Sequence, residues 1–344
     1  MEKTIRWGII GCGDVAEVKS GPGFQRARGS VLSAVMRRDG AKAADYALRH
    51  GVARWYDDAE KLIHDPDVNA VYVATPPGSH LEYALRVAAT GKPCYVEKPM
   101  ARSFVECARM VDAFQRRSLP LFVAYYRRAL PRFVRAKELI DSGALGRVTG
   151  CRYRMTRLYL PNPTASWRLD ARESGGGLFL DIGSHVLDVL DFLLGEFLEY
   201  GGDAHATYAT HATGVTTVED VVALHFRTDR GVIGSASWNF AASQSDELLE
   251  IDGTEARLSM QVLGCTPLKI SRGGEVVETI DLPDPPHIQQ PLIQTIVDEL
   301  LGRGKSPSTG QTAARTSKVM DAALQSFYNC RDDEFWTRSD TWRK

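Results

Sequence analysis

Two side chains in the middle of the sequence have the types and spacing of an acid–base pair. Asp181 and His185 are four residues apart in a segment with helical periodicity, so both would lie on one face of a helix. The imidazole could move a proton near neutral pH while the carboxylate orients or holds a substrate. The same spacing is also typical of a pair that only stabilises its helix. Three glycines at 175–177 precede the pair and would let a ligand or a backbone segment approach closely.

A lysine far from this pair in the sequence could supply positive charge for the same reaction. Lys98 follows an apolar run, at the C-terminal end of an expected parallel strand, where doubly wound sheets bind their ligands. Its ammonium group could stabilise a developing alkoxide. Lys98 would then act with Asp181 and His185 from the other domain. The alternative is a surface lysine held by Glu97.

A glycine-rich turn near the N-terminus predicts a nucleotide site. The turn reads Gly11-Cys12-Gly13-Asp14-Val15-Ala16, which has the spacing G-x-G-x-x-A. The glycines allow a tight turn and the close approach of a pyrophosphate, which would bind free N–H groups at the start of the following helix. Such turns also occur without ligands. Here a strand, the turn, a helix and a second strand follow in order, which favours dinucleotide binding.

The end of the second strand indicates which dinucleotide binds. An NAD-binding unit usually has an acid there, which accepts hydrogen bonds from the ribose hydroxyls. This sequence has Arg37 and Arg38 instead, and two guanidinium groups suit a 2′-phosphate. We therefore expect NADP as the cofactor, with NAD less favoured. In the alternative, both arginines are solvated and Asp39 serves the ribose.

The elements that would position these residues alternate between strands and helices in the first third of the chain. Strands are expected over residues 5–10, 31–36, 70–74, 93–96 and 121–124. Helices are expected to open at Val15 and to span 41–50, 79–89 and 103–117, with Ser79 as an N-cap. This alternation predicts a Rossmann domain over residues 1–125, an α/β unit with a doubly wound parallel sheet.

The pattern changes beyond residues 143–146. Period-two stretches predict strands over 148–157, 217–227, 232–240 and 247–252, separated by tight turns. Helices are expected over 178–194, 291–301 and 311–328. We therefore expect a C-terminal α+β domain over residues 126–344, built on a large, mainly antiparallel sheet arranged as a meander with helices on one face. The closing helices could pack back on the Rossmann domain.

Further motifs occur in an order that resembles one family. Glu97-Lys98-Pro99 is followed by Trp167-Arg168, by the three glycines and by Asp181-Ile182-Gly183-Ser184-His185. Together with the N-terminal glycine turn, this set resembles the Gfo/Idh/MocA oxidoreductases, the family of glucose–fructose oxidoreductase and inositol dehydrogenase, over nearly the whole chain. Residues 127–133 and the paired arginines are similar to the branch that contains 1,5-anhydrofructose reductase and dimeric dihydrodiol dehydrogenase.

The resemblance implies roles for individual residues. The lysine matching Lys98 lies at the boundary between nicotinamide and substrate, and the peptide bond before Pro99 is cis. The loop with Thr75, Pro76 and His80 would pack beside the cofactor riboses, although it also reads as an ordinary Pro-rich turn. The resemblance further implies cofactor contacts for Glu97, Trp167 and Arg168. Substrate contacts would come from Lys98, Tyr126, Arg127, Asp181 and His185, although aromatic residues at 125–126 are more often packing residues.

The composition of the chain limits which binding partners and cofactors we expect. The chain has 344 residues, enough for two domains, and a formal net charge of −1, which gives no long-range attraction to nucleic acid or anionic membranes. The six cysteines, including Cys330, are scattered, and no His, Cys or carboxylate cluster has ligand spacing, so we expect neither disulfides nor a metal. No apolar run is as long as a membrane span, and the charged N-terminus leads directly into a strand. We expect a cytoplasmic enzyme.

The expected reaction is hydride transfer between NADP and a CH–OH or C=O carbon of a sugar, cyclic polyol or diol. His185 would exchange the hydroxyl proton, Lys98 would stabilise the alkoxide, and Asp181 would anchor a neighbouring hydroxyl. Two alternatives from related proteins stay open: an NAD-dependent glycoside hydrolase and a non-catalytic regulator that senses a dinucleotide. Family analogy also predicts a homodimer or homotetramer formed through the exposed face of the large sheet.

Overall fold

The chain folds into two compact units. In this computed structural model, residues 4–158, 167–207, 218–329, 331 and 335 are described. The first unit consists of Met1–Ala101, Glu106–Leu130 and Pro285–Ala314, and the second of Arg102–Val105, Pro131–Asp284 and Arg315–Lys344. The expected division into 1–125 and 126–344 differs from these units mainly in residues 285–314. Thr217, at the start of an expected strand, and Cys330 lie outside the described residues.

The first unit is built on sheet A, a parallel sheet of six strands in the order β3-β2-β1-β4-β5-β6. Its strands are β1 (Ile5–Ile10), β2 (Ser30–Met36), β3 (Arg54–Tyr56), β4 (Ala70–Val73), β5 (Cys94–Val96) and β6 (Leu121–Val123). The order reverses between β1 and β4, so the C-terminal ends of these two strands flank the position where doubly wound sheets bind ligands. The expected Rossmann sheet is confirmed, and the short edge strand β3 is an addition to it.

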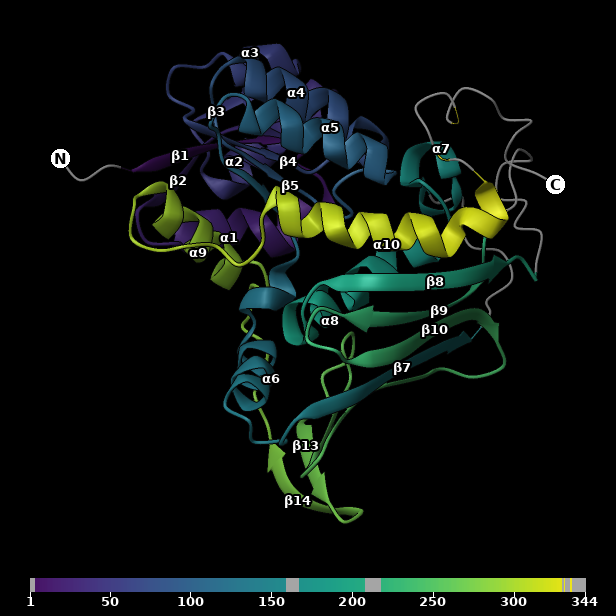
Figure 1. Ribbon diagram of the computed structural model, residues 1–344. Coiled ribbons are helices and arrows are strands. Elements are labelled where there is room, and N and C mark those ends of the chain that lie inside the picture. The colour runs from purple at the N-terminus through teal and green to yellow at the C-terminus, as the bar shows by residue number, and fades with distance from the viewer. Residues whose placement is uncertain (1–3, 159–166, 208–217, 330, 332–334, 336–344) are drawn as a thin grey trace. The chain divides into compact units, whose positions relative to one another are not determined.

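Helices pack on both faces of sheet A (Figure 1). They are α1 (Gly21–Arg26), α2 (Gly40–His50), α3 (Ala59–Ile63), α4 (His80–Ala89), α5 (Phe104–Gln115) and α9 (Gln290–Leu300). Successive residues of β1 face opposite sides of the sheet. The ring of Trp7 lies 4.8 Å from that of Phe24 in α1, whereas a Cβ on Gly8 would meet Leu62 of α3 at 2.6 Å. Glycine at this position therefore lets α3 lie directly on the strand.

The start of α4 differs from the expected N-cap. The helix begins at His80, and the Ser79 side chain accepts no hydrogen bond from its N–H groups. The Ser79 hydroxyl instead lies 2.7 Å from Thr75 Oγ1 and 3.0 Å from the carbonyl of Pro76, to which it donates. A 3₁₀ turn over Pro77–Ser79 precedes the helix. Ser79 therefore occupies the expected N-cap position, but its hydroxyl closes the loop and forms no capping hydrogen bond.

The second unit is built on sheet B, which has eight strands in the order β14-β13-β12-β11-β7-β10-β9-β8. The strands are β7 (Val148–Leu158), β8 (Phe197–His205), β9 (Val221–Thr228), β10 (Ile233–Ala242), β11 (Asp246–Gly253), β12 (Arg257–Met260), β13 (Leu268–Arg272) and β14 (Glu275–Ile280). All pairs are antiparallel except β7 and β10, which are parallel. The expected mainly antiparallel sheet is confirmed.

The simple meander was wrong because β7 lies between β10 and β11. Ion pairs join β7 to β11, with Arg152 at 3.3 Å from Glu250 and Arg154 at 2.9 Å from Asp246. On the other side of the strand, the ring of Tyr153 lies 5.5 Å from that of Trp238 in β10. Cross-strand pairs of this kind connect β7 to two strands that are consecutive in the sequence, and period-two patterning alone does not determine this order.

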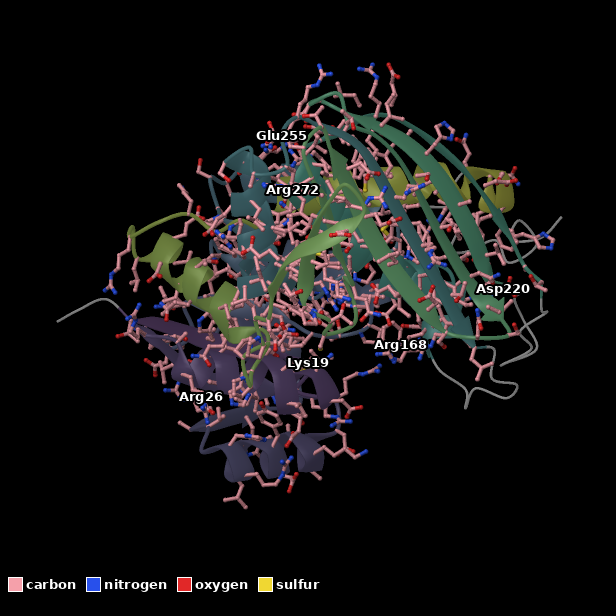
Figure 2. The ribbon with its side chains drawn as sticks, turned by 90° about the horizontal axis from the view of Figure 1, so that it is seen from below. Lys19, Arg26, Arg168, Asp220, Glu255 and Arg272 are labelled. Atoms are coloured by element: carbon pink, nitrogen blue, oxygen red, sulfur yellow. The ribbon has the colours of Figure 1, made fainter. Side chains whose placement is uncertain are left out.

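One face of sheet B is buried and the other is exposed. Along β9 and β10, buried and exposed residues alternate strictly over most of each strand. The buried face packs on α8 (Ser184–Leu194) and on the part of α10 (Gly310–Tyr328) that follows Arg315 (Figure 1). A Cβ on Gly202 of β8 would meet the backbone of Ala323 in α10 at 3.2 Å. Figure 2 shows Glu255 and Asp220 at opposite ends of the sheet.

The second unit also contains α6 (Pro131–Asp141) and the short helix α7 (Ala171–Ser174). Of the cysteines, the structure describes Cys12, Cys94, Cys107 and Cys151 as buried and Cys265 as exposed, all as free thiols.

Within the described part of the chain, no helix is both long enough and apolar enough to cross a bilayer. Among these residues there is also no group of three or more His, Cys, Asp or Glu that could hold a metal ion.

Candidate functional site

The glycine turn after β1 has one packed face and one open face. Gly11 has a φ of 93°, and a Cβ there would meet the carbonyl oxygen of Ala74 at 2.9 Å, so glycine is required. The N–H groups of Gly11 and Cys12 both donate to the carbonyl of Met36, at 2.9 and 3.2 Å, which fixes the turn to the end of β2. A Cβ on Gly13, in contrast, would meet nothing within 4 Å. The turn is therefore open on the side of Gly13.

The helical segment that follows the turn presents its first N–H groups to a ligand. It begins at Asp14, which is exposed, and Val15 is half-buried. The first N–H groups of a helix have no partner within the helix and attract anions. Ala16 is fully buried beneath the turn. The open face at Gly13 and this helix start fit a dinucleotide pyrophosphate, whereas Ala16 contributes packing.

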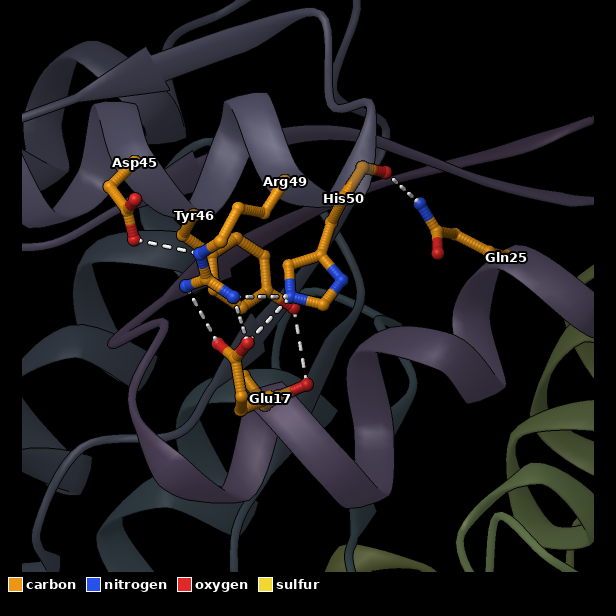
Figure 3. A network of polar contacts seen from close by, with 7 residues as sticks. Glu17, Gln25, Asp45, Tyr46, Arg49 and His50 are labelled. Carbon is orange, nitrogen blue, oxygen red and sulfur yellow. Dashed lines mark hydrogen bonds and ion pairs between the residues drawn. The ribbon is translucent and has the colours of Figure 1, made fainter.

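A π-helical turn over Ala16–Ser20 connects the glycine turn to α1 (Figure 3). The carbonyl of Ala16 accepts hydrogen bonds from the N–H of Gly21 and, at 3.1 Å, from the hydroxyl of Tyr46 in α2. A Cβ on Gly21 would meet this hydroxyl oxygen at 2.2 Å. Pro22 follows and has no N–H to continue an α-helical pattern. The sequence analysis did not identify this turn.

A charged cluster ties the same turn to α2 (Figure 3). Both carboxylate oxygens of Glu17 contact the guanidinium group of Arg49, and the Nε2 atom of His50 lies 2.8 Å from Glu17 Oε1. Arg49 also donates to Asp45 at 2.8 Å. The hydrogen bond from Arg49 is the main cause that lowers the pKa of Glu17 to about 2. The start of the nucleotide-binding helix is thus anchored by an ion pair.

The two arginines after β2 differ in burial. Arg37 is half-buried and Arg38 is exposed, and no hydrogen bond or ion pair joins either guanidinium group to another described residue. Burial raises the pKa of the Cys12 thiol to about 11, while the charge of Arg37 acts in the opposite direction. The charge of Arg37 therefore acts on a residue of the glycine turn. Asp39 is used elsewhere: its carboxylate accepts the N–H of Lys42 at 3.2 Å and caps α2.

Glu97 has a buried carboxylate that fixes the backbone at Lys98. Its Oε1 atom accepts the hydroxyl of Tyr72 at 2.6 Å and the side-chain amide of Gln289 at 2.7 Å. Its Oε2 atom accepts the N–H of Lys98 at 2.9 Å. The Lys98–Pro99 peptide bond is cis, as the resemblance implies, and Lys98 is half-buried. Glu97, expected to contact the cofactor, is thus engaged within the protein, and it holds the main chain of Lys98.

His80 connects two loops at the same edge of sheet A. The side chain is fully buried, with Nδ1 at 3.1 and 3.2 Å from the carbonyls of Pro99 and Met100 and Nε2 at 2.6 Å from the carbonyl of Thr75. Burial lowers the pKa of His80, so the neutral form is favoured. The ring positions the loop that contains Thr75 and Pro76, both half-buried. This geometry agrees with a structural role for His80.

Tyr126 and Arg127 are both more than nine-tenths buried after β6. Arg127 donates to the Tyr126 hydroxyl at 3.1 Å, and its guanidinium carbon lies 5.0 Å from the centre of the Tyr126 ring. The two side chains therefore stack on each other. These contacts agree with packing and leave the predicted contact with substrate untested.

Asp181 and His185 lie on either side of a change in helix type. Residues Phe179–Gly183 form a π-helical turn, and α8 begins at Ser184. A Cβ on Gly183 would meet the ring of Phe179 at 2.4 Å. The expected helix over 178–194 is confirmed in its bounds, and its first part is π-helical, with the Phe179 ring beside Gly183. The Asp181 side chain is 20% exposed and His185 is 7% exposed. Such π-turns are frequent at functional sites.

Arg168 forms an ion pair that the sequence analysis missed. Its Nε atom lies 3.0 Å from Oδ2 of Asp181, and its guanidinium carbon lies 4.6 Å from the centre of the Trp167 ring. The Arg168 side chain is 41% exposed. Trp167 and Arg168 were expected to contact the cofactor. The structure places both in the second unit, where Arg168 provides a counter-charge for Asp181.

The three glycines before the π-turn are approached by backbone. Gly175 has a φ of 91°, and a Cβ there would meet the carbonyl oxygen of Arg102 at 2.7 Å. A Cβ on Gly177 would meet the carbonyl oxygen of Glu219 at 2.3 Å. Of the two explanations that the sequence left open for these glycines, the close approach of backbone is therefore the one observed.

The structure thus forms two groups of candidate residues, one in each unit. The first comprises residues at the C-terminal ends of strands of sheet A: the glycine turn, Arg37, the Thr75 loop and Lys98. The second comprises Trp167, Arg168, Asp181 and His185, next to α8. The first group fits a dinucleotide, and the second combines a carboxylate with an imidazole.

Both units match models of one family. Residues 5–125 match a model described as the oxidoreductase family with an NAD-binding Rossmann fold, and residues 133–259 match the GFO/IDH/MocA C-terminal domain. The chain belongs to the Gfo/Idh/MocA oxidoreductase family. The resemblance found in the sequence is therefore confirmed, and the first unit contains an NAD-binding Rossmann domain.

Individual relatives support the same assignment. The chain is 38% identical to an oxidoreductase of Formosa agariphila over 326 residues, which cover 93% of this chain and 98% of that protein. It is 29% identical to the 1,5-anhydro-D-fructose reductase of Ensifer adhaerens, with 89% and 91% of the two chains covered. A solved levoglucosan dehydrogenase in complex with NADH superposes with a TM-score of 0.83 at 25% identity, covering 94% and 96% of the chains. These relatives are oxidoreductases, which does not favour a hydrolase or a regulator.

Proposed function

We propose that this oxidoreductase prefers NADP and transfers hydride between the nicotinamide and a CH–OH or C=O carbon of a sugar, cyclic polyol or diol. The observation that carries the proposal is the pair formed by Asp181 on the π-turn and His185 at the start of α8, in a chain whose glycine turn fits a dinucleotide. Two relatives are named for sugar derivatives, 1,5-anhydro-D-fructose and levoglucosan, which supports this class of substrate. The bound cofactor would supply the hydride acceptor or donor.

His185 would move the proton of the reacting hydroxyl group. In the oxidative direction the neutral imidazole takes this proton, and in the reductive direction the imidazolium returns it. Asp181 would accept a hydrogen bond from a neighbouring substrate hydroxyl. The contact between Arg168 Nε and Asp181 Oδ2 at 3.0 Å orients this carboxylate. The small exposed fraction of His185 limits competition from water.

Lys98 would stabilise negative charge on the reacting oxygen. An ammonium group acts most strongly when its position is fixed before the reaction. The hydrogen bond from the Lys98 N–H to Glu97 fixes the main chain at this position, and the buried Glu97 is itself held by Tyr72 and Gln289. We therefore assign Lys98 an electrostatic role and Glu97 a positioning role.

The preference for NADP rests on Arg37 and Arg38. An acid at the end of β2 would repel a 2′-phosphate, whereas guanidinium groups attract it. The half-buried Arg37 and the engagement of Asp39 in the α2 cap both support phosphate recognition over ribose binding by Asp39. A hydrogen bond to a charged group contributes about 1.5–3 kcal/mol, and solvent exposure reduces the sum. We expect a net preference of about 2–3 kcal/mol, or roughly 30- to 150-fold in affinity.

Cofactor titrations and a substrate panel test the proposal. Nicotinamide absorbance would be followed with NAD and NADP against sugars, cyclic polyols and diols. Arg37→Asp should remove most of the NADP preference without lowering NAD affinity. Arg26→Asp makes the same charge change at an exposed position at the end of α1 and serves as the control. Equal affinity of the unmodified protein for both cofactors would refute the preference, and no turnover on the panel would refute the reaction.

We propose in addition that the exposed face of sheet B forms a homodimer or homotetramer interface. On neighbouring strands of this face, Ala223 on β9 is paired to Ser237 on β10 and His225 to Ser235, and three of these four side chains are short. All four are exposed. A flat face of this kind suits the packing of two sheets. Replacing Ser237 with Arg should shift the mass measured by light scattering toward the monomer, and an unmodified protein that is already monomeric would contradict the proposal.

A further inference from the structure

Glu219 is a buried carboxylate that holds the glycine segment from a distant part of the sequence. The residue is 1% exposed. Its two oxygens lie 2.9 and 2.8 Å from the N–H of Gly177, and the hydroxyl of Tyr328 donates to Oε2 at 2.6 Å. Glu219 directly precedes the Asp220 turn into β9, whereas Tyr328 is the last residue of α10. The carboxylate therefore joins three separate segments of the second unit.

Arg331 acts on the other end of the same glycine segment. Its guanidinium group donates to the carbonyl of Gly175 and, at 2.5 Å, to the carbonyl of Arg102. It also pairs with Asp321 of α10 at 2.9 Å. The guanidinium carbon lies 5.4 Å from the centre of the Tyr328 ring. Gly175 is thus held by Arg331, just after α10, and Gly177 by Glu219, which Tyr328 at the end of α10 contacts.

These contacts lie immediately before the π-turn. Only Leu178 separates Gly177 from Phe179, where the π-turn with Asp181 begins. Glycines have no side chains that could fix them by packing, and they have the widest choice of backbone conformations. Hydrogen bonds to the Gly177 N–H and the Gly175 carbonyl therefore help to fix where this turn starts, together with those between Ser174 and Gly176. Packing fixes Phe179, the first residue of the π-turn, because its ring lies 4.9 Å from that of Trp238.

We propose that Glu219, Tyr328 and Arg331 form a lock on the Gly175–Gly177 segment that positions Asp181 and His185 for catalysis. This inference rests on the proposed function. None of the three lock residues is assigned a contact with substrate. They act through the main chain, and a small displacement of the π-turn would move both catalytic side chains. Displacements of about 1 Å can lower turnover about 100-fold.

The free-energy cost of burying the polar groups of the lock supports this positioning role. Removing a carboxylate from water is unfavourable, and burial raises the pKa of Glu219 and that of the Tyr328 phenol. An apolar residue at position 219 could not accept the N–H of Gly177, which would then be buried without a partner. The fold therefore buries a carboxylate, at a cost in free energy, at the point where the glycine segment must be fixed.

Tyr328→Phe is the first test, because it removes one hydroxyl and keeps the ring packed on Phe335. Tyr153→Phe is a matched control. The Tyr153 hydroxyl also donates to a carboxylate, Glu247, at 3.2 Å, and Glu247 accepts the N–H groups of Val262, Leu263 and Gly264. This second arrangement has the same chemistry in the same unit, but its turn carries no candidate catalytic residue.

Hydrogen–deuterium exchange of residues 175–185 and the steady-state constants would be measured on both variants. We expect faster exchange of this segment and a kcat lowered about 10-fold or more in Tyr328→Phe only, with unchanged NADP affinity. Glu219→Gln, which keeps the shape and one acceptor, should show the same pattern. It also provides the test if Tyr328→Phe does not fold.

Each outcome decides a separate question. Unchanged exchange at 175–185 in both lock variants would overturn the lock. Faster exchange with a kcat within a factor of two of the unmodified enzyme would overturn its catalytic purpose. Equal losses of kcat in Tyr328→Phe and Tyr153→Phe would show that the lock contributes only to general stability. An unmodified protein that turns over nothing on the substrate panel would refute the proposed function, and the exchange data alone would then decide whether the lock exists.

Discussion

Two buried carboxylates, one in each unit, have the same local chemistry. Glu97 and Glu219 are 6% and 1% exposed, and each accepts a tyrosine hydroxyl at 2.6 Å. Each also accepts a main-chain N–H beside a candidate catalytic segment, from Lys98 in the first unit and from Gly177 in the second. They differ in sequence distance. Glu97 is adjacent to its partner, whereas 42 residues separate Glu219 from Gly177.

This difference explains why one site was evident in the sequence and the other was not. Glu97-Lys98-Pro99 is a contiguous motif that follows a strand, so its importance can be read locally. The position of Asp181 and His185 depends on Glu219, which precedes β9, and on Tyr328 at the end of α10, and no local pattern connects them. The first unit therefore has a locally encoded site, and the second has one assembled by long-range contacts.

The largest expected effect separates proton transfer from cofactor binding. His185→Asn should lower kcat roughly 100-fold or more, the usual scale for a lost acid–base group, and should leave NADP affinity nearly intact. Steady-state kinetics across pH and a cofactor titration would measure both. A loss of less than a few-fold at every pH would make His185 a packing residue, and the second unit would then lack the catalytic role that the comparison assumes.

The next effect tests the lysine that Glu97 positions. Lys98→Met keeps most of the side-chain volume and removes the charge, so we expect kcat to fall about 10- to 100-fold with little change in stability. Turnover and the midpoint of urea unfolding would be compared with those of the unmodified enzyme. If the variant unfolds easily while its folded fraction turns over normally, Lys98 has a structural role only.

A third change tests Glu97, the carboxylate of the first unit. Glu97→Leu removes the acceptor for Tyr72, Gln289 and the Lys98 N–H, and we expect a loss of about 2–3 kcal/mol in the free energy of unfolding, because buried donors lose their partner. Glu97→Gln keeps an acceptor and should cost less. Urea unfolding of both variants would measure the difference. If both variants lost the same small amount of unfolding free energy, Glu97 would not be the residue that fixes this segment.

The smallest effect concerns Glu17, a third carboxylate, which is partly exposed and tied to Arg49. The pKa of Glu17 is lowered to about 2, below its ordinary value near 4.5, so its stabilising effect is complete above pH 4.5 and is lost as the pH falls toward 2. After a reduction for solvent screening, Glu17→Gln should cost about 1 kcal/mol at pH 7 and almost nothing near pH 2. Urea titrations at both values test this. A loss independent of pH would exclude the ion pair as its cause.

The local features of the first unit could be predicted because adjacent residues encode them. A glycine at position 11 is required by its own positive φ, and short, mainly apolar β-strands alternate with amphipathic helices. Parallel strands then place the glycine turn and Lys98 at the same edge of the sheet, since their C-terminal ends always lie there. The motifs, their order and the family followed from the sequence by itself.

Only the tertiary structure decided how sheet B is ordered and what surrounds Asp181. The position of β7 between β10 and β11 depends on cross-strand pairs, which period-two patterning leaves open. The Phe179 ring packs beside Gly183 in the π-turn, and the pairing of Arg168 with Asp181 and the approach of Glu219 to Gly177 join residues distant in sequence. A local pattern records which backbone conformations a segment can adopt, whereas contacts between distant segments select one of them.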